Sequence, residues 1–445
     1  MAANIIYFLL LQIHILIILI LQSGYFFRYF ITIVFILLAT MIFSNKIYSS
    51  GSSLSKLAWV RFKRNMLGMI SLSVILITVL VAIIGYLITP DSTPMCNTQI
   101  LEISTQKPGF AVDILKIRKN QPYIHTSIFH KMLFGANSNY RVVPISEYKF
   151  ENDMINIAVF DQDGHGFNEE FNIANVVMPI TDTLYEKNNR IYYNGINGQT
   201  KNESVEILQK EILNYNITSR KYLLGTDQFG RDLLSRLIIG SRVSLSVGFI
   251  SVTISLIVGI FLGSLAGFFR GRTDDIIMWF INVVWSIPTL LLVIAITFAL
   301  GRGFWQIFVA VGLTMWVEVA RVVRGQILGM REKEFVEAGF ALGFSNFRII
   351  LFHIIPNILS PVIVISAANF AAAILIEAGL SFLGIGVQPP MPSWGSMIKE
   401  YYSFIILDSA YLAIIPGIAI IILVLAFMTL GNALRDVLDV KVLKN

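Results

Sequence analysis

Six long apolar runs dominate this sequence and limit what it can fold into. About 20 mostly apolar residues are needed for a helix to cross the roughly 30 Å hydrocarbon core of a bilayer. Backbone amides inside lipid find partners only within a helix or a closed barrel, so we predict that each run is a membrane-spanning helix. Charged residues make up only 14% of the chain, against about 25% in soluble domains. The predicted spans are residues 66–89, 243–268, 276–300, 304–322, 361–383 and 411–431.

Residues 90–222, between the first two spans, have a different character. They are rich in Asn, Asp, Glu and Lys, and short β-rich pieces alternate with turn signals. Ile155–Phe160 runs into the turn-forming residues 161–164, and Tyr192-Tyr-Asn-Gly195 is a hairpin signal. A segment of about 130 residues is long enough for a small domain. We predict a folded α+β or mainly β insertion, and the alternative is an unstructured loop.

The N-terminal region holds two further apolar runs, at about 5–21 and 25–43. Residues 1–44 are either a transmembrane hairpin, which we favour, or an upstream stretch included by a wrong start codon. A cleaved signal peptide is disfavoured, because no basic residue precedes the first apolar run. Residues 45–65 form a basic segment that we expect to be cytoplasmic.

Lysine and arginine set the predicted orientation, because they are enriched on the cytoplasmic side of membrane proteins. The short loops on the other side hold only Arg302 and Lys399. Both termini are therefore predicted to be cytoplasmic and residues 90–222 external. Three external arginines, Arg231, Arg236 and Arg242, are tolerated because long translocated segments obey the rule weakly. This arrangement, rather than a nucleic-acid partner, explains the net charge of +6. The basic clusters lie at 45–65, 270–272, 321–348 and 435–444.

The predicted cytoplasmic stretch between the fourth and fifth spans contains a short amphipathic helix, at about 333–344. Its apolar residues recur at helical spacing. Gly343 can end the helix in the left-handed conformation, Ser345 can cap the next segment, and Pro356 precedes the fifth span. Small residues on this helix would let another protein approach it closely. The alternative interpretation is an ordinary cytoplasmic loop that lies on the bilayer. The apolar face consists of Phe335, Ala338, Gly339 and Leu342.

This stretch resembles the EAA signature of ABC-transporter permease subunits. The resemblance implies that residues 326–357 form the loop that couples the permease to an ATP-binding subunit. The third signature position is usually alanine, and Gly339 keeps it small but weakens an exposed helix by up to about 1 kcal/mol. The residues that match are Glu337, Ala338, Gly339, Gly343, Ile354, Ile355 and Pro356.

Two further segments resemble the C-type permeases of peptide/nickel transport systems. They are 224–245, which contains Gly-Thr-Asp-Gln-Phe-Gly-Arg-Asp, and 380–396, which contains Pro-Ser-Trp-Gly. The resemblance covers about 55–90 and 223–440 and leaves the insertion outside. It implies an all-α polytopic membrane protein, with a six-helix type I ABC importer core over 66–89 and 223–435. Residues 436–445 would then be a cytoplasmic tail.

The same resemblance implies a function and a set of partners. The chain would be a bacterial inner-membrane permease subunit of an ATP-driven importer for di- and oligopeptides. Its partners would be a second homologous permease subunit, two ATPase subunits and an external substrate-binding protein. The alternative substrates are nickel chelates or other small peptides.

The sequence gives no sign of catalytic or cofactor chemistry in this chain. It lacks a G-x-x-x-x-G-K-[ST] phosphate loop, so ATP hydrolysis is expected on a separate subunit. Its five histidines show no metal-ligand spacing, and we expect neither a metal nor a cofactor. The rival functions are an ion-coupled secondary transporter that uses Glu377 and a membrane-anchored sensor whose residues 90–222 bind a ligand.

A group of residues on the external side is predicted to form a gate or an interface. Thr226 or Asp227 is expected to cap a helix through 233–237, which either lies on the external leaflet and steadies the gate or is a solvated helix start. The stiff loop around Trp394 suits contact with a delivery protein or anchoring in the membrane interface. The candidates are Asp227, Gly230, Arg231, Asp232, Arg236 and Trp394.

Two carboxylates and four helix-shaping residues complete the predictions. Glu318 is expected to pair with Arg321 one turn away. Glu377 lies in an apolar span, where we favour a hydrogen bond to a neighbouring helix over substrate contact, a role in the gate or proton coupling. Pro288 is expected to kink the third span. Glycines at a spacing of four allow close helix crossing, and they are Gly259, Gly263 and Gly267.

Overall fold

The computed structural model describes residues 54–162, 166–187, 189–196, 198–301 and 303–438. The chain divides into two compact units, 1–61 and 62–445, and the helix α3 (Leu54–Arg64) contains the boundary between them. The predicted hairpin at 1–44 lies outside the described residues, as does most of the tail.

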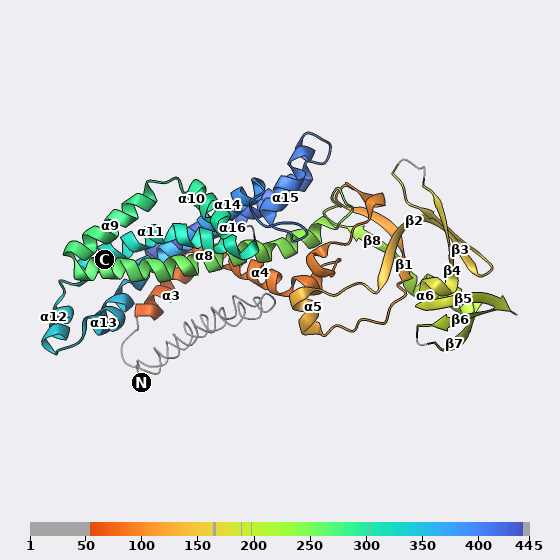
Figure 1. Cartoon of the computed structure of the whole chain (residues 1–445), viewed down its shortest axis with the longest axis horizontal. Coiled ribbons are helices and arrows are strands. Elements are labelled where there is room, and N and C mark those ends of the chain that lie inside the picture. The colour runs from red at the N-terminus through yellow and green to blue at the C-terminus, as the bar shows by residue number, and fades with distance from the viewer. Residues whose placement is uncertain (1–53, 163–165, 188, 197, 302, 439–445) are drawn as a thin grey trace. The chain divides into compact units, whose positions relative to one another are not determined.

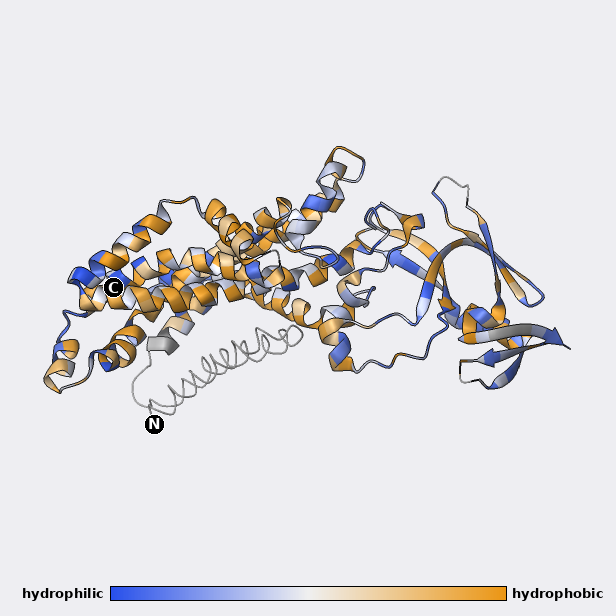
Figure 2. Cartoon of the chain, in the orientation of Figure 1, coloured by the Kyte–Doolittle hydropathy of each residue, from blue (hydrophilic) through white to orange (hydrophobic). Residues whose placement is uncertain are grey.

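Five helices are long and apolar enough to span a membrane, and five of the six predicted spans coincide with them to within a residue or lie inside them. Figure 2 shows apolar residues along these helices. The third predicted span is broken into α9 (Gly271–Trp285) and α10 (Thr289–Leu300), which are bent by 94°. Pro288 precedes α10, so the predicted kink is confirmed. The five helices are α4 (Met66–Ile88), α8 (Leu233–Phe269), α11 (Phe304–Met330), α14 (Leu359–Phe382) and α16 (Tyr411–Leu438).

The helix α8 begins ten residues earlier than the predicted span. Asp232 is its N-cap, and its side chain accepts a hydrogen bond of 2.9 Å from the Ser235 amide. The predicted caps were therefore wrong, because Thr226 and Asp227 bond elsewhere. The expected separate helix at 233–237 is instead the first turns of α8.

The glycine stripe of α8 packs against α11, as the spacing predicted. A Cβ atom at Gly259 would lie 2.5 Å from the Val319 side chain, and one at Gly263 would lie 2.5 Å from the Ala320 carbonyl. Gly267 meets Ile327 in the same way. The two helices run side by side in Figure 1 because no side chain separates them along this stripe.

The insertion is a folded α+β domain, which confirms the prediction. One antiparallel sheet has the order β4-β3-β2-β1-β8 and the other β5-β6-β7. The predicted strand at 155–160 is β3, and the predicted hairpin signal falls in β6, which pairs with β7. Its core includes Leu115, Ile157, Ile173, Ile191 and Leu208. The elements are β1 (Phe110–Arg118), α5 (Ile128–Phe134), β2 (Tyr140–Glu151), β3 (Met154–Val159), β4 (Asn168–Asn172), α6 (Ile173–Val177), β5 (Ile180–Lys187), β6 (Arg190–Gly195), β7 (Thr200–Ser204), α7 (Val205–Glu211) and β8 (Ile217–Tyr222).

Shorter helices lie at both ends of the bundle of spans. We call the end that carries the insertion the insertion end and the other the opposite end. At the insertion end are η2 (Pro94–Cys96), η3 (Leu101–Ile103), α15 (Trp394–Tyr401) and η7 (Tyr402–Ile405). At the opposite end are α12 (Glu334–Ala341), α13 (Asn346–Ile349), η5 (Ile350–Ile354) and η6 (Ile355–Ile358). The π-helical turn η4 (Ile212–Asn216) belongs to the insertion.

Candidate functional site

The loop between β8 and α8 is held in a conformation that only glycine permits. Gly230 has a φ of +67°, and a Cβ atom there would lie 1.6 Å from the carbonyl oxygen of Ile100. The loop folds back on Asp227, whose Oδ1 accepts hydrogen bonds of 2.9 Å from the amides of Phe229 and Arg231. This turn brings the side chains of Asp227 and Arg231 together.

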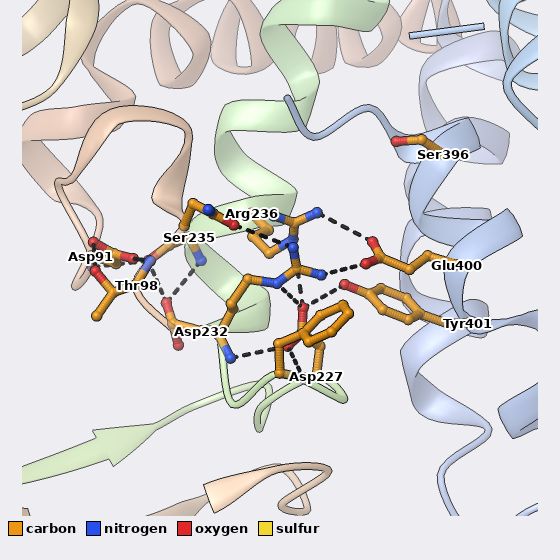
Figure 3. Close-up of polar contacts among 12 residues, drawn as sticks. Asp91, Thr98, Asp227, Asp232, Ser235, Arg236, Ser396, Glu400 and Tyr401 are labelled. Carbon is orange, nitrogen blue, oxygen red and sulfur yellow. Dashed lines mark hydrogen bonds and ion pairs between the residues drawn. The ribbon is translucent and has the colours of Figure 1, made fainter. Parts of the chain in front are cut away.

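These two residues belong to a buried charge cluster that joins the loop, α8 and α15 (Figure 3). Arg231 Nε lies 2.6 Å from Asp227 Oδ2, and Arg231 Nη2 lies 2.6 Å from Glu400 Oε1. Arg236 Nη2 lies 3.3 Å from Glu400 Oε2 and its Nε lies 3.7 Å from Asp227 Oδ2. The Tyr401 hydroxyl donates a 2.7 Å hydrogen bond to Asp227. Two arginines thus face two carboxylates, so the formal charges cancel.

Burial makes the pairing in this cluster obligatory. Asp227, Arg231, Arg236 and Tyr401 are all buried, and Glu400 is the most exposed member. Burial tends to lower the pKa of Arg231, but Tyr401, Asp227 and Glu400 together raise it above its usual value. Burial also raises the pKa of Tyr401 well above its ordinary range, so its hydroxyl stays a donor. The expectation of a solvated helix start is therefore wrong, because these charges lie inside the protein.

Asp232 points away from the charge cluster and forms a second polar contact beside it. Its carboxylate accepts hydrogen bonds from the amide and hydroxyl of Ser235, and the Ser235 hydroxyl accepts one of 3.0 Å from the Asp91 amide. Burial raises the pKa of Asp232, and the bonds from Ser235 oppose this shift. These contacts tie the start of α8 to the segment that follows α4.

Trp394 lies in the interior of the chain, so this side chain takes neither predicted role, although residues 388–390 of the same loop are exposed. It is buried, and its indole N–H donates a 2.9 Å hydrogen bond to the Leu237 carbonyl. A Cβ atom at Gly240 would lie 3.0 Å from its ring. The side chain therefore fastens α15 to α8 and reaches neither a delivery protein nor the membrane interface.

The two intramembrane carboxylates have different surroundings. Glu377 is fully buried and accepts a 2.6 Å hydrogen bond from Ser381 on its own helix. Ser393, the N-cap residue of the neighbouring helix α15, also contributes a side-chain hydrogen bond to Glu377. Glu318 makes no ion pair with Arg321 within the described part of the chain. Arg321 instead donates a 2.7 Å hydrogen bond to Asn282 and lies over the Trp285 ring.

At the opposite end of the bundle, α12 ends in a Schellman turn. The Phe344 amide donates to the Gly339 carbonyl at 3.0 Å, and the Gly343 amide donates to the Phe340 carbonyl at 2.9 Å. Gly343 has a φ of +74°, which confirms that it ends the helix in the left-handed conformation. Ser345 precedes α13 at the N-cap position, but its side chain makes no capping bond.

One face of α12 is fixed to the bundle and the other is exposed. Val336 and Gly339 are buried, and Val336 joins an apolar cluster with Phe268 of α8 and Ile327 of α11. Gly339 therefore turns inward, contrary to its predicted place on the exposed apolar face. The remaining residues of that face, and most residues of the EAA signature, face outward. Exposed are Phe335, Glu337, Ala338, Leu342, Gly343 and Pro356, and Ile355 is half-buried.

Sequence reasoning missed Glu400 and Tyr401, which complete the charge cluster. Glu400 lies more than 160 residues from the two arginines that it pairs with, and Tyr401 lies more than 170 residues from Asp227, to which it donates. Local sequence gave no signal for them, because Asp227 and Asp232 already balance the charges of Arg231 and Arg236 in this segment. No group of three metal-binding side chains occurs within the described residues.

Two family models match this chain. "Binding-protein-dependent transport system inner membrane component" matches residues 259–444, and "N-terminal TM domain of oligopeptide transport permease C" matches residues 53–108. Residues 109–258, which hold most of the insertion and the first part of α8, lie outside both matches. The EAA segment lies within the first.

Relatives with curated names align over about half of the chain. The dipeptide transport system permease protein DppC of Alkalihalophilus pseudofirmus is 40% identical over 50% of this chain and 73% of its own length. The glutathione transport system permease protein GsiD of Pectobacterium atrosepticum is 39% identical over 50% of this chain and 74% of its own length. A solved structure of inward-facing conformations of the MetNI methionine ABC transporter gives a TM-score of 0.39 at 18% identity, covering 45% of this chain and 96% of that one.

Proposed function

The chain belongs to the family of binding-protein-dependent transport system inner membrane components, and we propose that it forms half of a translocation pathway for di- and oligopeptides. The family consists of transport permeases, so partnership with an ATPase and a binding protein follows from membership. The second half of the pathway would come from a homologous permease subunit. We assign ATP hydrolysis to the separate ATPase subunits and no cofactor to this chain.

Peptides are the proposed substrate class because of the relatives that this chain resembles. One family model is named for oligopeptide permeases, and two relatives at about 40% identity are named for dipeptides and glutathione. Nickel chelates remain the alternative substrates. Uptake of a labelled dipeptide in the presence of either an unlabelled peptide or a nickel chelate distinguishes the two classes, because only the true substrate class competes.

The two-sided character of α12 is the observation that carries the proposed coupling. Val336 seats this helix on α8 and α11, and Gly339 packs beside Ile349 of α13. Phe335, Ala338 and Leu342 present an apolar surface that nothing in the described chain covers. A helix held on one side and exposed on the other suits transmission of a movement from an outside partner. We propose that the exposed face docks on the ATPase and that the buried face passes the movement to the spans.

The charge cluster has a complementary role at the insertion end. Asp227, Arg231, Arg236 and Glu400 join the start of α8 to the end of α15, and separating them would expose unpaired charges in a poorly hydrated interior. We propose that α8 and α15 therefore move as one body when the external gate opens. If α12 docks on the ATPase and the charge cluster lies at the external gate, the insertion is external, and α12 and both termini are cytoplasmic.

Site-directed crosslinking in native membranes tests the coupling proposal. Leu342 on α12 is 71% exposed, and Ile276 on α9 is 67% exposed. A cysteine crosslinker on Leu342→Cys is expected to trap the ATPase subunit, whereas Ile276→Cys is expected to leave it free. The parent chain, whose single cysteine is buried, supplies the background. Absence of an ATPase adduct at position 342, or equal adducts at both positions, would overturn the proposal.

A further inference from the structure

The short helix α5 connects the insertion directly to the spans. Arg242 of α8 donates hydrogen bonds of 2.8 and 2.9 Å to the carbonyls of Met132 and Leu133, in the last turn of α5. The same guanidinium donates to the carbonyls of Ala82 and Ile83 on α4, at 2.5 and 3.0 Å. One arginine thus holds the end of α5 against the interior of a spanning helix.

These contacts fix the depth of α5. Ile83 lies five residues before Ile88, where α4 ends, and a rise of 1.5 Å per residue places its carbonyl about 8 Å inside the helix end. Arg242 directly precedes the apolar run that begins at residue 243. Both measures put the end of α5 beside the insertion-side ends of the apolar parts of α4 and α8, where an interface with lipid headgroups is expected.

The outward surface of α5 is apolar. Ile128 is 72% exposed and Phe129 is 75% exposed, and Phe134 is also exposed, as is Ile124 in the segment before the helix. His130 and Lys131 lie on the same turn, where they suit the phosphates of lipid headgroups. Large apolar side chains in such an exposed position are unfavourable in water but are stabilised at a membrane interface.

We propose that α5 is a lipid-binding foot, through which the insertion rests in the membrane leaflet on its own side with Ile128 and Phe129 among the acyl chains. The surface of α4, against which α5 packs, supports lipid as the occupant. Leu80, Leu87 and Ile88 of α4 are exposed, so α5 extends an apolar surface that already faces the bilayer. Neither family model covers α5, and the proposal is independent of the transported substrate.

Spin labelling of the full chain in phosphatidylethanolamine/phosphatidylglycerol vesicles tests the foot. Labels are placed at Phe129→Cys, at Leu80→Cys as the lipid reference, and at Tyr215→Cys on the insertion, where Tyr215 is 72% exposed. Burial raises the pKa of the Cys96 thiol, so the native cysteine reacts poorly. Collisions with oxygen report lipid, and collisions with a water-soluble nickel chelate report solvent.

The label at position 129 is expected to favour oxygen over the nickel chelate, as the label at position 80 does, while the label at position 215 shows the reverse. Ile128→Cys repeats the measurement one residue away. A label at 129 that behaves like the one at 215 would overturn the proposal, because the helix would lie in water. Protection from both reagents would also overturn it, because protein from residues 1–44 or a partner subunit would then cover α5.

Discussion

Gly343→Val is expected to uncouple ATP hydrolysis from transport. The backbone of Gly343 has a φ of +74°, and a left-handed conformation costs an L-residue about 1–2 kcal/mol. No atom lies within 4 Å of the position that a Cβ would take, so no clash adds to this cost. A change of this size lowers the ratio of the native turn to its alternatives by a factor of about 5–30.

The loss of the turn acts on the seat of α12. The turn is closed by the amides of Gly343 and Phe344, which bond to the carbonyls of Phe340 and Gly339. Gly339 is buried against Ile349 of α13, which belongs to the same apolar cluster as Val336. When the turn opens, the exposed face can still meet the ATPase, but its movement no longer reaches the spans. The number of peptides imported per ATP hydrolysed is therefore expected to fall.

The assay is uptake of a labelled dipeptide and release of phosphate, measured together on the complete transporter in proteoliposomes. Gly325→Val is the matched control, because Gly325 is exposed in α11, has ordinary helical backbone and meets no atom within 4 Å. The reasoning is refuted if Gly343→Val imports as many peptides per ATP as the parent, or if Gly325→Val loses coupling equally.

Two further substitutions test the packing and the start of α8. Gly263→Ala would place a Cβ atom 2.5 Å from the Ala320 carbonyl, so it is expected to destabilise the α8–α11 contact by about 1–3 kcal/mol and to lower the Tm. In the control variant Gly379→Ala the new Cβ atom meets nothing within 4 Å, and the Tm is expected to stay unchanged. Asp232→Ala removes the N-cap of α8, so it is expected to lower the free energy of unfolding by about 1 kcal/mol and to speed hydrogen exchange of the Ser235 amide. Asp232→Asn keeps an acceptor for this amide and is expected to keep its exchange slow. Equal exchange rates in the two variants would contradict the capping role.

The spans were predictable because lipid allows few solutions. A long apolar run must be helical in a bilayer, and five of the six runs correspond to single helices. Hydropathy did not identify the start of α8, because the polar residues Asp232 and Arg236 interrupt the apolar pattern there. In the structure Asp232 is the N-cap of α8 and Arg236 lies in its first turn. Arg236 pairs with Glu400 of α15, more than 150 residues later in the sequence, and Asp232 lies beside the segment that follows α4, more than 100 residues earlier. The hydropathy of one segment does not indicate that a segment far away in the sequence will bury its polar residues.

The candidate sites were predictable in part. Local motifs identified Asp227, Arg231 and Arg236, but their partners Glu400 and Tyr401 come from a distant helix and share no spacing with them. For α12, periodicity identified the helix and its end. It placed Gly339 on the wrong face because a pattern of apolar residues does not distinguish the side that packs on its own chain from the side left for a partner.

A single helix connects the two sites, which gives the proposed coupling a physical route. The helix α8 has 37 residues and is therefore about 55 Å long. Arg236, near its start, lies in the charge cluster, and Phe268, near its end, lies in the apolar cluster that seats α12. Between these points the glycine stripe holds it against α11 without intervening side chains. A displacement of α12 therefore acts on a stiff, closely packed rod whose far end is bonded to α15, so the two ends are not free to move independently.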